Sequence, residues 1–465
     1  MNIGSWLGWA VVCCAVVVSS VFAEEEAPEV DRTKSRMSYI ENDRIKLGVD
    51  LNVGGAVTYL AEKGGDNLIN STDWGRQIQM SFYSGPIPFE PNGKKPMGFW
   101  RGLGWNPIQA GDSYAHGSKV VEHRNEGDKL YVKCVPMQWP LNNEPGECTF
   151  ECWYELEGNV VKGRYKLNNS RSDKKQYPGR NQELPAVYAN GRWSRIFTYL
   201  GDKPFTGAPL TEIAHLWKGG PTNEPWGRWQ TPERWAAMVD REGRGLGVWS
   251  RQATEFNGGY FGTVVGEGGA ADLQTNYLGP VRREIIDHNI EYEYSTHLIV
   301  GSLEEIRQYV YEKTPRTVSP DYLFKHSRDG WVYDGATDSG WPIRDELDIR
   351  FSGGDAMLAG PPDFWLAQDV PGIRIKAALL SENASCALLW KTSKDSGFSD
   401  ARSKSVDMIG DGVSRDYTVE PSDCPAYQGG IVQIALKIKS AAPGDTLKID
   451  YVGLSGYPCN KGEIK

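Results

Sequence analysis

Short runs in which hydrophobic and polar residues alternate recur along most of the chain. Clear examples are LYVKCV (residues 130–135), VVKGRYKL (160–167), YEYSTHLIV (292–300) and IVQIALKI (431–438). A period of two residues is typical of a strand with one buried face. The sequence has 53 glycines and 27 prolines among its 465 residues, and these bound the runs. The pattern therefore predicts an all-β protein, with a hairpin at 234–250, RWAAMVDREGRGLGVWS.

One segment has helical spacing instead. In SLEEIRQYVYEK, residues 302–313, Ser302 is placed to cap a helix on which Ile306, Tyr309 and Val310 share a face. Residues 317–328, which follow it, predict a linker. We therefore expect a first domain over 37–316 and a second over 329–456, the latter about the size of one β-sandwich.

The first residues predict export. Met1 to Ala23 carry no charged side chain, and their apolar run ends in Val-Phe-Ala before three glutamates. This is typical of a secretory signal peptide, residues 1–23. We expect a secreted protein, extracellular or periplasmic, that has no membrane attachment once the signal is removed. In an exported chain the six remaining cysteines favour disulfides. They are Cys134, Cys148, Cys152, Cys386, Cys424 and Cys459.

Charge and motifs exclude several classes of protein. The formal charge is −9 and there is no basic run, so nucleic acid is not an expected partner. There is no phosphate-binding loop, dinucleotide fingerprint or Gly-x-Ser-x-Gly elbow. No cofactor and no catalytic metal are expected. A structural Ca²⁺ ion can stabilise either domain, although no dedicated loop for it is seen. The oligomeric state is left open.

The segment from Asp73 to Asp112 interleaves aromatic residues with amides, arginine and carboxylate on a backbone broken by glycine and proline. A sugar ring needs both kinds of group, since its C–H faces stack on aromatic rings and its hydroxyls need polar partners. We favour carbohydrate binding over buried aromatics whose polar neighbours satisfy turns. The candidate binding residues here are Arg76, Gln79, Trp105, Asn106, Gln109 and Asp112.

Two further segments, 180–193 and 217–235, crowd polar and aromatic residues in the same way. Their tryptophans either bind sugar or pin a long loop to the sheet, and both interpretations stay open. His288, in a polar turn, is a plausible further site residue, whereas His215 and His297 sit among apolar neighbours and are expected in the core. The candidate binding residues from this part are Asn190, Trp229, Trp235 and His288.

The chain from about 37 to 316 resembles the galactose-mutarotase-like β-supersandwich family. The carrying segments are GVDLNVGGAVTYLAEKGGDNLINSTDWGRQIQ (48–79) and the 234–250 hairpin. The resemblance implies a sugar-related function without fixing a reaction. The Asn-His-aromatic signature of an aldose epimerase is not found, the nearest match being Asp287-His288-Asn289. The second domain, with Trp365, LLWKTS, Tyr427 and LKIDYVGLSG, resembles a jelly-roll-like carbohydrate-binding β-sandwich.

These observations together favour an enzyme that cleaves glycosidic bonds of a polysaccharide. β-Elimination needs a base, a proton donor and partners for a uronate carboxylate. Tyr188 and His116 are the candidates for proton transfer, with Arg76, Asn106 and Gln109 as carboxylate partners.

Hydrolysis instead needs two carboxyl groups, for which Glu183 and Glu233 are the candidates, with Asp112 in reserve. We favour elimination slightly over hydrolysis. The alternative is a non-catalytic protein that holds glycans in its aromatic clefts.

Overall fold

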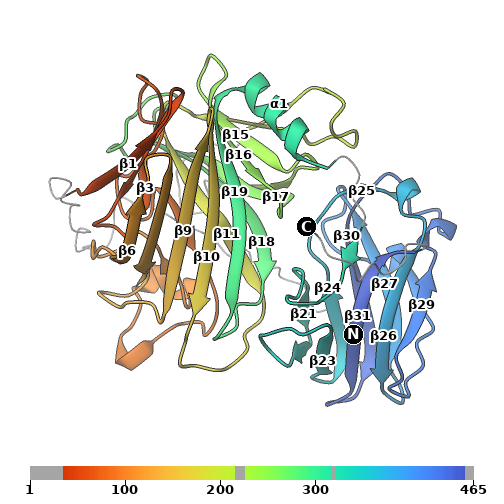
Figure 1. Cartoon of the computed structure of the whole chain (residues 1–465). Coiled ribbons are helices and arrows are strands. Elements are labelled where there is room, and N and C mark those ends of the chain that lie inside the picture. Colours follow the sequence, from red (N-terminus) through yellow and green to blue (C-terminus); the bar gives the residue numbers. More distant parts are fainter. Residues whose placement is uncertain (1–34, 215–225, 316–319, 456–465) are drawn as a thin grey trace.

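The computed structural model describes residues 35–214, 226–315 and 320–455. The predicted signal peptide, His215, Trp217 and Cys459 lie outside these ranges. In the described residues, antiparallel sheets stack in pairs to form two sandwiches side by side (Figure 1). The all-β prediction is confirmed.

The first sandwich consists of two large sheets, both built from the chain before residue 303. The main path of the first sheet is β1 (Met37–Glu41), β2 (Ile45–Asp50), β3 (Ala56–Glu62), β4 (Ile78–Ser81), β11 (Arg180–Asn190), β18 (Thr275–Glu284), β17 (Glu255–Phe261) and β14 (Gly227–Gln230). Beside β4 lie β5 (Pro107–Ile108) and then β8 (Met137–Gln138). The second sheet runs β13 (Thr211–Ile213), β12 (Arg195–Thr198), β15 (Trp235–Val239), β16 (Arg244–Ser250), β19 (Glu291–Ser302), β10 (Val160–Asn169), β9 (Cys148–Glu157), β7 (Lys129–Val135) and β6 (Lys119–Asn125).

Alternate side chains of these strands point into one core between the two sheets. Ile78 and Met80 of β4 and Val187 of β11 meet Leu167 of β10 and Leu298 of β19 there. The predicted hairpin is formed by β15 and β16, which pair from Trp235–Trp249 to Val239–Gly245. Because side chains in a strand alternate between its two faces, this packing leaves the other residues of β4, β11 and β18 on the outer face of the first sheet.

The predicted helix is confirmed as α1 (Leu303–Lys313). Ser302 caps it, accepting from the backbone N–H of Glu305, whose side chain accepts from the Ser302 N–H. Ile306 and Val310 are buried against β15, β16 and β19. Within the described residues, no helix is long and apolar enough to cross a membrane. Short 3₁₀ turns occupy η2 (Pro91–Gly93), η3 (Gly98–Leu103), η4 (Ala367–Asp369), η5 (Asp400–Arg402) and η6 (Pro421–Asp423).

The second sandwich is built from the chain after residue 320 and has its own core. One sheet runs β22 (Ala336–Asp338), β23 (Leu347–Phe351), β31 (Thr446–Leu454), β26 (Ile373–Leu380) and β29 (Arg415–Val419), with β20 (Asp321–Tyr322) beside β31. The other runs β21 (Val332–Asp334), β24 (Gly354–Ala359), β30 (Gly430–Ala441), β27 (Ser385–Thr392) and β28 (Ser403–Val406), with β25 (Trp365–Leu366) beside β30. In the predicted linker, Asp321 and Tyr322 already pair with β31 and Phe324 is fully buried, so this part packs with the second sandwich.

A buried ionic network joins the two sandwiches. The Arg328 guanidinium lies 2.6 Å from Asp338 of its own sandwich and 2.6 Å from Asp287 of the first. The Gln176 amide donates to Asp287 at 3.2 Å and to Asp338 at 2.6 Å. Burial alone would raise the pKa of Asp338, but hydrogen bonds and the charge of Arg328 outweigh it, so the pKa lies below its usual value.

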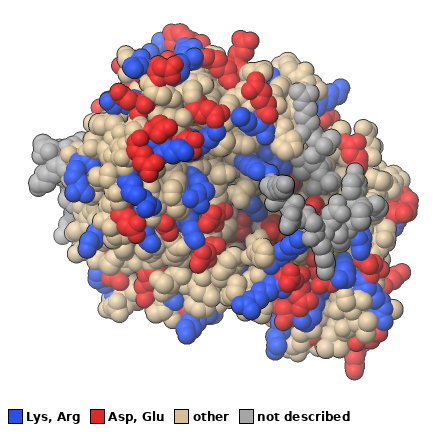
Figure 2. All heavy atoms as spheres, in the orientation of Figure 1, with Lys and Arg blue, Asp and Glu red and all other residues tan. Residues whose placement is uncertain are grey.

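On the face drawn in Figure 2, basic and acidic side chains are intermixed.

Among the five cysteines that the structure describes, the expected disulfides are not formed. Cys134, Cys148, Cys152, Cys386 and Cys424 are all free thiols. Cys134 lies opposite Phe150, which places Cys148 and Cys152 at the two diagonal positions on the neighbouring strand. Diagonal neighbours are about 7–8 Å apart, which is longer than the Cα separation of most disulfides. The three thiols instead pack as small apolar side chains in the core.

We predict that the buried cysteines resist alkylation because solvent cannot reach them, and not because they are oxidised to disulfides. Burial raises the pKa of Cys152 and of Cys386 to about 12, so both stay protonated near neutral pH. Iodoacetamide should leave Cys134, Cys152 and Cys386 unlabelled in the native protein and label all three after denaturation without reductant, as read by peptide mass spectrometry. Labelling that requires a reductant would contradict the structure.

Arg328→Met should lower the free energy of unfolding by roughly 3–5 kcal/mol, because it leaves Asp287 and Asp338 buried without their positive partner. Urea denaturation measures the change. The matched control is Lys376→Met, which breaks the partly exposed pair with Asp450 at 3.0 Å and should cost no more than about 1 kcal/mol. Equal losses in the two variants would show that the buried network does not hold the sandwiches together.

Candidate functional site

The outer face of the first sheet carries a pocket whose floor follows from strand alternation. Ile78 and Met80 of β4 point into the core. Gln79, Ser81 and, just beyond the strand, Tyr83 point the opposite way and line the pocket. The same two-residue period that builds the core therefore delivers three polar side chains to the outer face.

The pocket side of β11 depends on a β-bulge. The register of β11 shifts between Glu183 and Val187 against β18. Without that shift, Glu183 and Ala186 would point to opposite faces, because they are three positions apart along the strand. With it, Glu183, Ala186 and Tyr188 all line the pocket while Leu184 and Val187 stay in the core.

Aromatic residues wall the pocket on the other side. Trp100 and Leu103 of η3 pack with Tyr83, Ile108 and Trp139 in one cluster. The Trp100 and Trp139 rings meet edge to face, 5.6 Å apart. The pocket has a volume of about 40 Å³. That is room for about three water-sized groups, so a substituent of a sugar can enter while the ring itself rests at the mouth.

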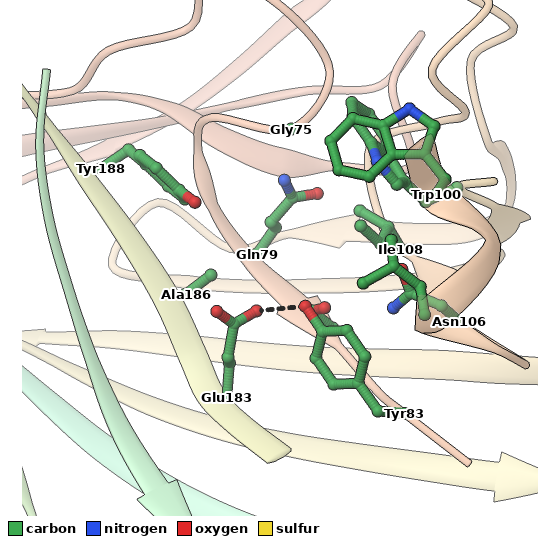
Figure 3. A pocket seen from close by; sticks show the side chains of 12 residues that line it. Gly75, Gln79, Tyr83, Trp100, Asn106, Ile108, Glu183, Ala186 and Tyr188 are labelled. Atoms are coloured by element: carbon green, nitrogen blue, oxygen red, sulfur yellow. Dashed lines mark hydrogen bonds between the residues drawn. The ribbon is translucent and has the colours of Figure 1, made fainter. Parts of the chain in front are cut away.

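Glu183 lies at the base of this pocket and is 6% exposed (Figure 3). Its Oε2 accepts a hydrogen bond from the Tyr83 hydroxyl at 3.0 Å. Its Oε1 accepts one from the Tyr277 hydroxyl of the neighbouring strand β18. Phenol donors to a carboxylate are strong hydrogen bonds, and two of them fix the orientation of the side chain.

Tyr188 stands next to this carboxylate. Its ring lies 4.7 Å from that of Tyr277, because the two residues are directly paired between β11 and β18. Trp226 and Phe261 complete an aromatic cluster around them. In Figure 3 the Tyr188 hydroxyl points across the pocket toward Gln79. The phenol of Tyr188 and the carboxylate of Glu183 therefore line the same cavity, with Tyr277 behind them.

Asn106 is the remaining polar wall residue from the predicted binding set. Its amide Nδ2 donates to the Phe82 carbonyl at 2.8 Å, and its backbone N–H donates to Gln138. Its Oδ1 is buried without a hydrogen-bond partner. An unpaired buried acceptor costs roughly 1–3 kcal/mol, and a ligand hydroxyl can remove that cost.

His116 and Asp112 form a pair on an adjacent loop. The Nδ1 of His116 lies 3.0 Å from the Asp112 carboxylate, which is buried and also accepts from the backbone N–H groups of Tyr114 and Asn143. This fixes the imidazole with Nδ1 toward Asp112. The loop joins the pocket wall through Ser113, whose N–H donates to the Trp139 carbonyl at 3.1 Å. The imidazole itself does not line the pocket.

Several predicted binding residues lie in the protein interior instead. Arg76 is 1% exposed and donates to the Leu273 carbonyl, with Asp73 at 3.3 Å. Gln109 donates to the Gly54 carbonyl and accepts from the Met80 N–H. The side chains of Arg76 and Gln109 thus form hydrogen bonds with backbone groups. This matches the alternative interpretation of the segment, in which polar residues beside buried aromatics satisfy turns. Trp105 and Asn190 are likewise buried and outside the pocket.

Glu233 is not placed with Glu183. It is fully buried beneath α1 and accepts from Arg307, Tyr311, the Trp235 indole and the Phe205 N–H. Every contact is to the protein itself, so Glu233 and Trp235 tie the loop before β15 to the helix. Trp229 packs partly buried against the first core, and His288 is half-buried; neither lines the pocket.

Tyr83, Tyr277 and Trp139 were not predicted as site residues from the sequence. Tyr83 had a usable signal, since it continues the alternation of Gln79 and Ser81. Tyr277 had none, because only its pairing with Tyr188 brings it to Glu183. No group of three or more His, Cys, Asp or Glu side chains that could hold a metal ion occurs within the described ranges.

No protein-family model and no curated protein sequence matches this chain. Solved structures do resemble it. A putative aldose 1-epimerase from Escherichia coli K12 matches with a TM-score of 0.36 and 12% identity, over 58% of this chain and 100% of its own. A galactose mutarotase related enzyme from Lactobacillus acidophilus gives 0.36 and 13%, over 57% and 98%. The 4-alpha-glucanotransferase of Thermococcus litoralis gives 0.34 and 12%, over 58% and 39%.

The chain thus resembles galactose-mutarotase-like structures over about three-fifths of its length, as the sequence predicts. At these identities and TM-scores the likeness concerns the fold alone. It supports no statement about activity.

Glu183 and Tyr277 should be energetically coupled. Tyr277→Phe removes a donor to a buried carboxylate, and such a bond contributes roughly 1.5–3 kcal/mol. In a double-mutant cycle with Glu183→Gln, measured by urea denaturation, we expect a coupling free energy of roughly 1–3 kcal/mol. Strictly additive losses would mean that the phenol does not position the carboxylate.

Proposed function

We propose that this protein is a carbohydrate-active enzyme that cleaves glycosidic bonds of a polysaccharide lying across the outer face of the first sheet. The observation that carries the proposal is the Glu183 carboxylate, buried at the base of an aromatic pocket and held by the phenols of Tyr83 and Tyr277. A carboxylate in contact with phenols is an arrangement suited to proton transfer.

The walls of the pocket favour a sugar as the substrate. The indoles of Trp100 and Trp139 offer apolar surface at the mouth, where the C–H face of a pyranose ring can pack. Gln79 and Asn106 offer amide groups for hydroxyls. The small volume of the pocket admits a ring substituent to the level of Glu183 and keeps the chain of the polymer outside.

The composition of the lining favours elimination over hydrolysis. Hydrolysis needs two carboxyl groups across one bond. Glu183 is the one acidic residue among those that line the pocket, all of which belong to the described chain. The predicted partner, Glu233, is buried under α1 and engaged there. A carboxylate with neighbouring phenols instead supplies a base and an acid.

In this reaction the ring of a uronic acid lies at the mouth with its C5–H directed into the pocket, and Glu183 takes that proton. The C–H electron pair forms the C4–C5 double bond, and the C4–O bond breaks with its electrons on the leaving oxygen. Tyr188 donates its phenol proton to that oxygen, and the phenolate regains a proton from Glu183. Of the predicted partners for the uronate carboxylate, Asn106 lines the pocket whereas Arg76 and Gln109 do not.

A second candidate function is non-catalytic glycan binding. The observation that favours it is that each oxygen of Glu183 already accepts a phenol hydrogen bond, so the carboxylate can serve as a rigid acceptor for a sugar hydroxyl. In that case the aromatic walls carry the affinity and no product forms.

We also propose that the protein acts outside the cytoplasm. Support comes from the uncharged stretch Met1–Ala23 and its small-residue cleavage pattern. The protein should be recovered from the culture medium or the periplasm, and N-terminal sequencing should show that it begins at Glu24.

Glu183→Gln should lower turnover by roughly 10²–10⁴-fold, because it removes the proton-transfer group. The assay follows a panel of acidic and neutral polysaccharides by the absorbance of 4,5-unsaturated uronates and, in parallel, by reducing ends. Glu233→Gln is the matched control: it also removes a buried carboxylate, but it should cost stability and leave turnover per folded molecule unchanged.

The outcomes separate the candidates. Unsaturated product together with reducing ends supports elimination at Glu183. Reducing ends without the chromophore would replace elimination by hydrolysis. No product with any polysaccharide, but retained binding of one of them, would establish the non-catalytic function.

A further inference from the structure

A second and larger cavity lies where the two sandwiches meet. It has a volume of about 370 Å³, at the small end of the range for ligand sites. One wall comes from β18, β19 and Gln252 of the first sandwich, and the other from Tyr322 and residues 361–363 of the second. The two sandwiches therefore build it jointly.

This cleft is distinct from the pocket at Glu183. Val281 of β18 pairs with Glu183 and shares its outer face. Arg282, the next residue, points to the opposite face and lines the cleft. A ligand in one site therefore does not touch the other.

Three buried polar atoms in the cleft have no hydrogen-bond partner. One is the Nε of Arg282, whose charge faces Glu284 at 3.1 Å. The other two are the hydroxyl of Tyr322, a residue that is 7% exposed, and the Oε1 of Gln252. Leaving a buried polar group unpaired is unfavourable. The hydroxyl is a donor and the amide oxygen an acceptor, so a ligand hydroxyl can satisfy either.

The cations of the cleft are already neutralised. Arg282 lies 3.1 Å from Glu284, Arg328 is held by two aspartates, and Arg234 pairs with Asp363. No other basic residue is among its described lining residues, whereas Asp321 adds negative charge. An anionic ligand would meet no unpaired positive charge and several carboxylates, so the site disfavours acids.

The remaining wall is apolar. Trp341 packs partly buried against both cores, and Pro361 and Pro362 also line the cleft. An indole beside unpaired hydroxyl and amide groups matches the two kinds of surface that a sugar presents. We propose that the interdomain cleft binds a neutral saccharide, independently of the reaction at Glu183.

The test is isothermal titration of the full-length protein with neutral tetrasaccharides of glucose, mannose, galactose and xylose, and with tetragalacturonate as the acidic probe. At least one neutral probe should bind. Tyr322→Phe and Gln252→Leu should each weaken that binding about 3–10-fold, since each removes one hydrogen bond to the ligand. Tyr322→Phe should not lower the melting temperature without ligand, because the buried hydroxyl it removes has no protein partner.

Two controls separate this site from the rest of the protein. Tyr294→Phe removes another buried unpaired hydroxyl, in the first core, and should leave binding unchanged. Glu183→Gln should also leave it unchanged, so that loss of activity at the pocket and loss of binding at the cleft are told apart. Neutral-probe binding that is unchanged in both cleft variants would overturn the proposal. So would tetragalacturonate binding that Tyr322→Phe and Gln252→Leu weaken as much as they weaken binding of the neutral probe. No binding of any probe, as for a cleft that holds only water, would overturn it as well.

Discussion

The packing of the first sheet against the second fixes everything that the outer face presents. Ile78, Met80, Leu184 and Val187 must point inward to fill the core, and this sets the register of β4 and β11. Period-two alternation then leaves no freedom for their neighbours. The bulge in β11 is the one departure, and it turns Ala186 to the same side as Glu183 and Tyr188. The sheet therefore places Glu183 and Tyr188 through their backbone, and the phenols of Tyr83 and Tyr277 then fix the orientation of the carboxylate.

Much of the fold could be predicted from local patterns. The α1 capping box and the β15–β16 hairpin each depend on residues that are close together in the sequence, and both form where expected. The prediction of disulfides was wrong for the described cysteines because an even number of cysteines says nothing about strand register. Here the register places Cys148 and Cys152 diagonally from Cys134.

The candidate site was only half predictable, and for a physical reason. Glu183, Tyr188, Gln79 and Asn106 were found because their residue types were unusual for their surroundings, and they line one pocket. Arg76 and Gln109 had the same appearance but serve interior backbone groups. Sequence composition cannot separate a polar group that satisfies its own chain from one that awaits a ligand. That distinction, like the Tyr277–Glu183 contact, depends on long-range pairing.

The most direct measurement is a crystal structure of the Glu183→Gln variant with an oligosaccharide of the polymer that the protein binds. The account predicts a sugar ring against Trp100 and Trp139, with one ring substituent inside the pocket within hydrogen-bond reach of position 183 and Tyr188. An oligosaccharide bound elsewhere on the protein, with the pocket empty, would contradict it.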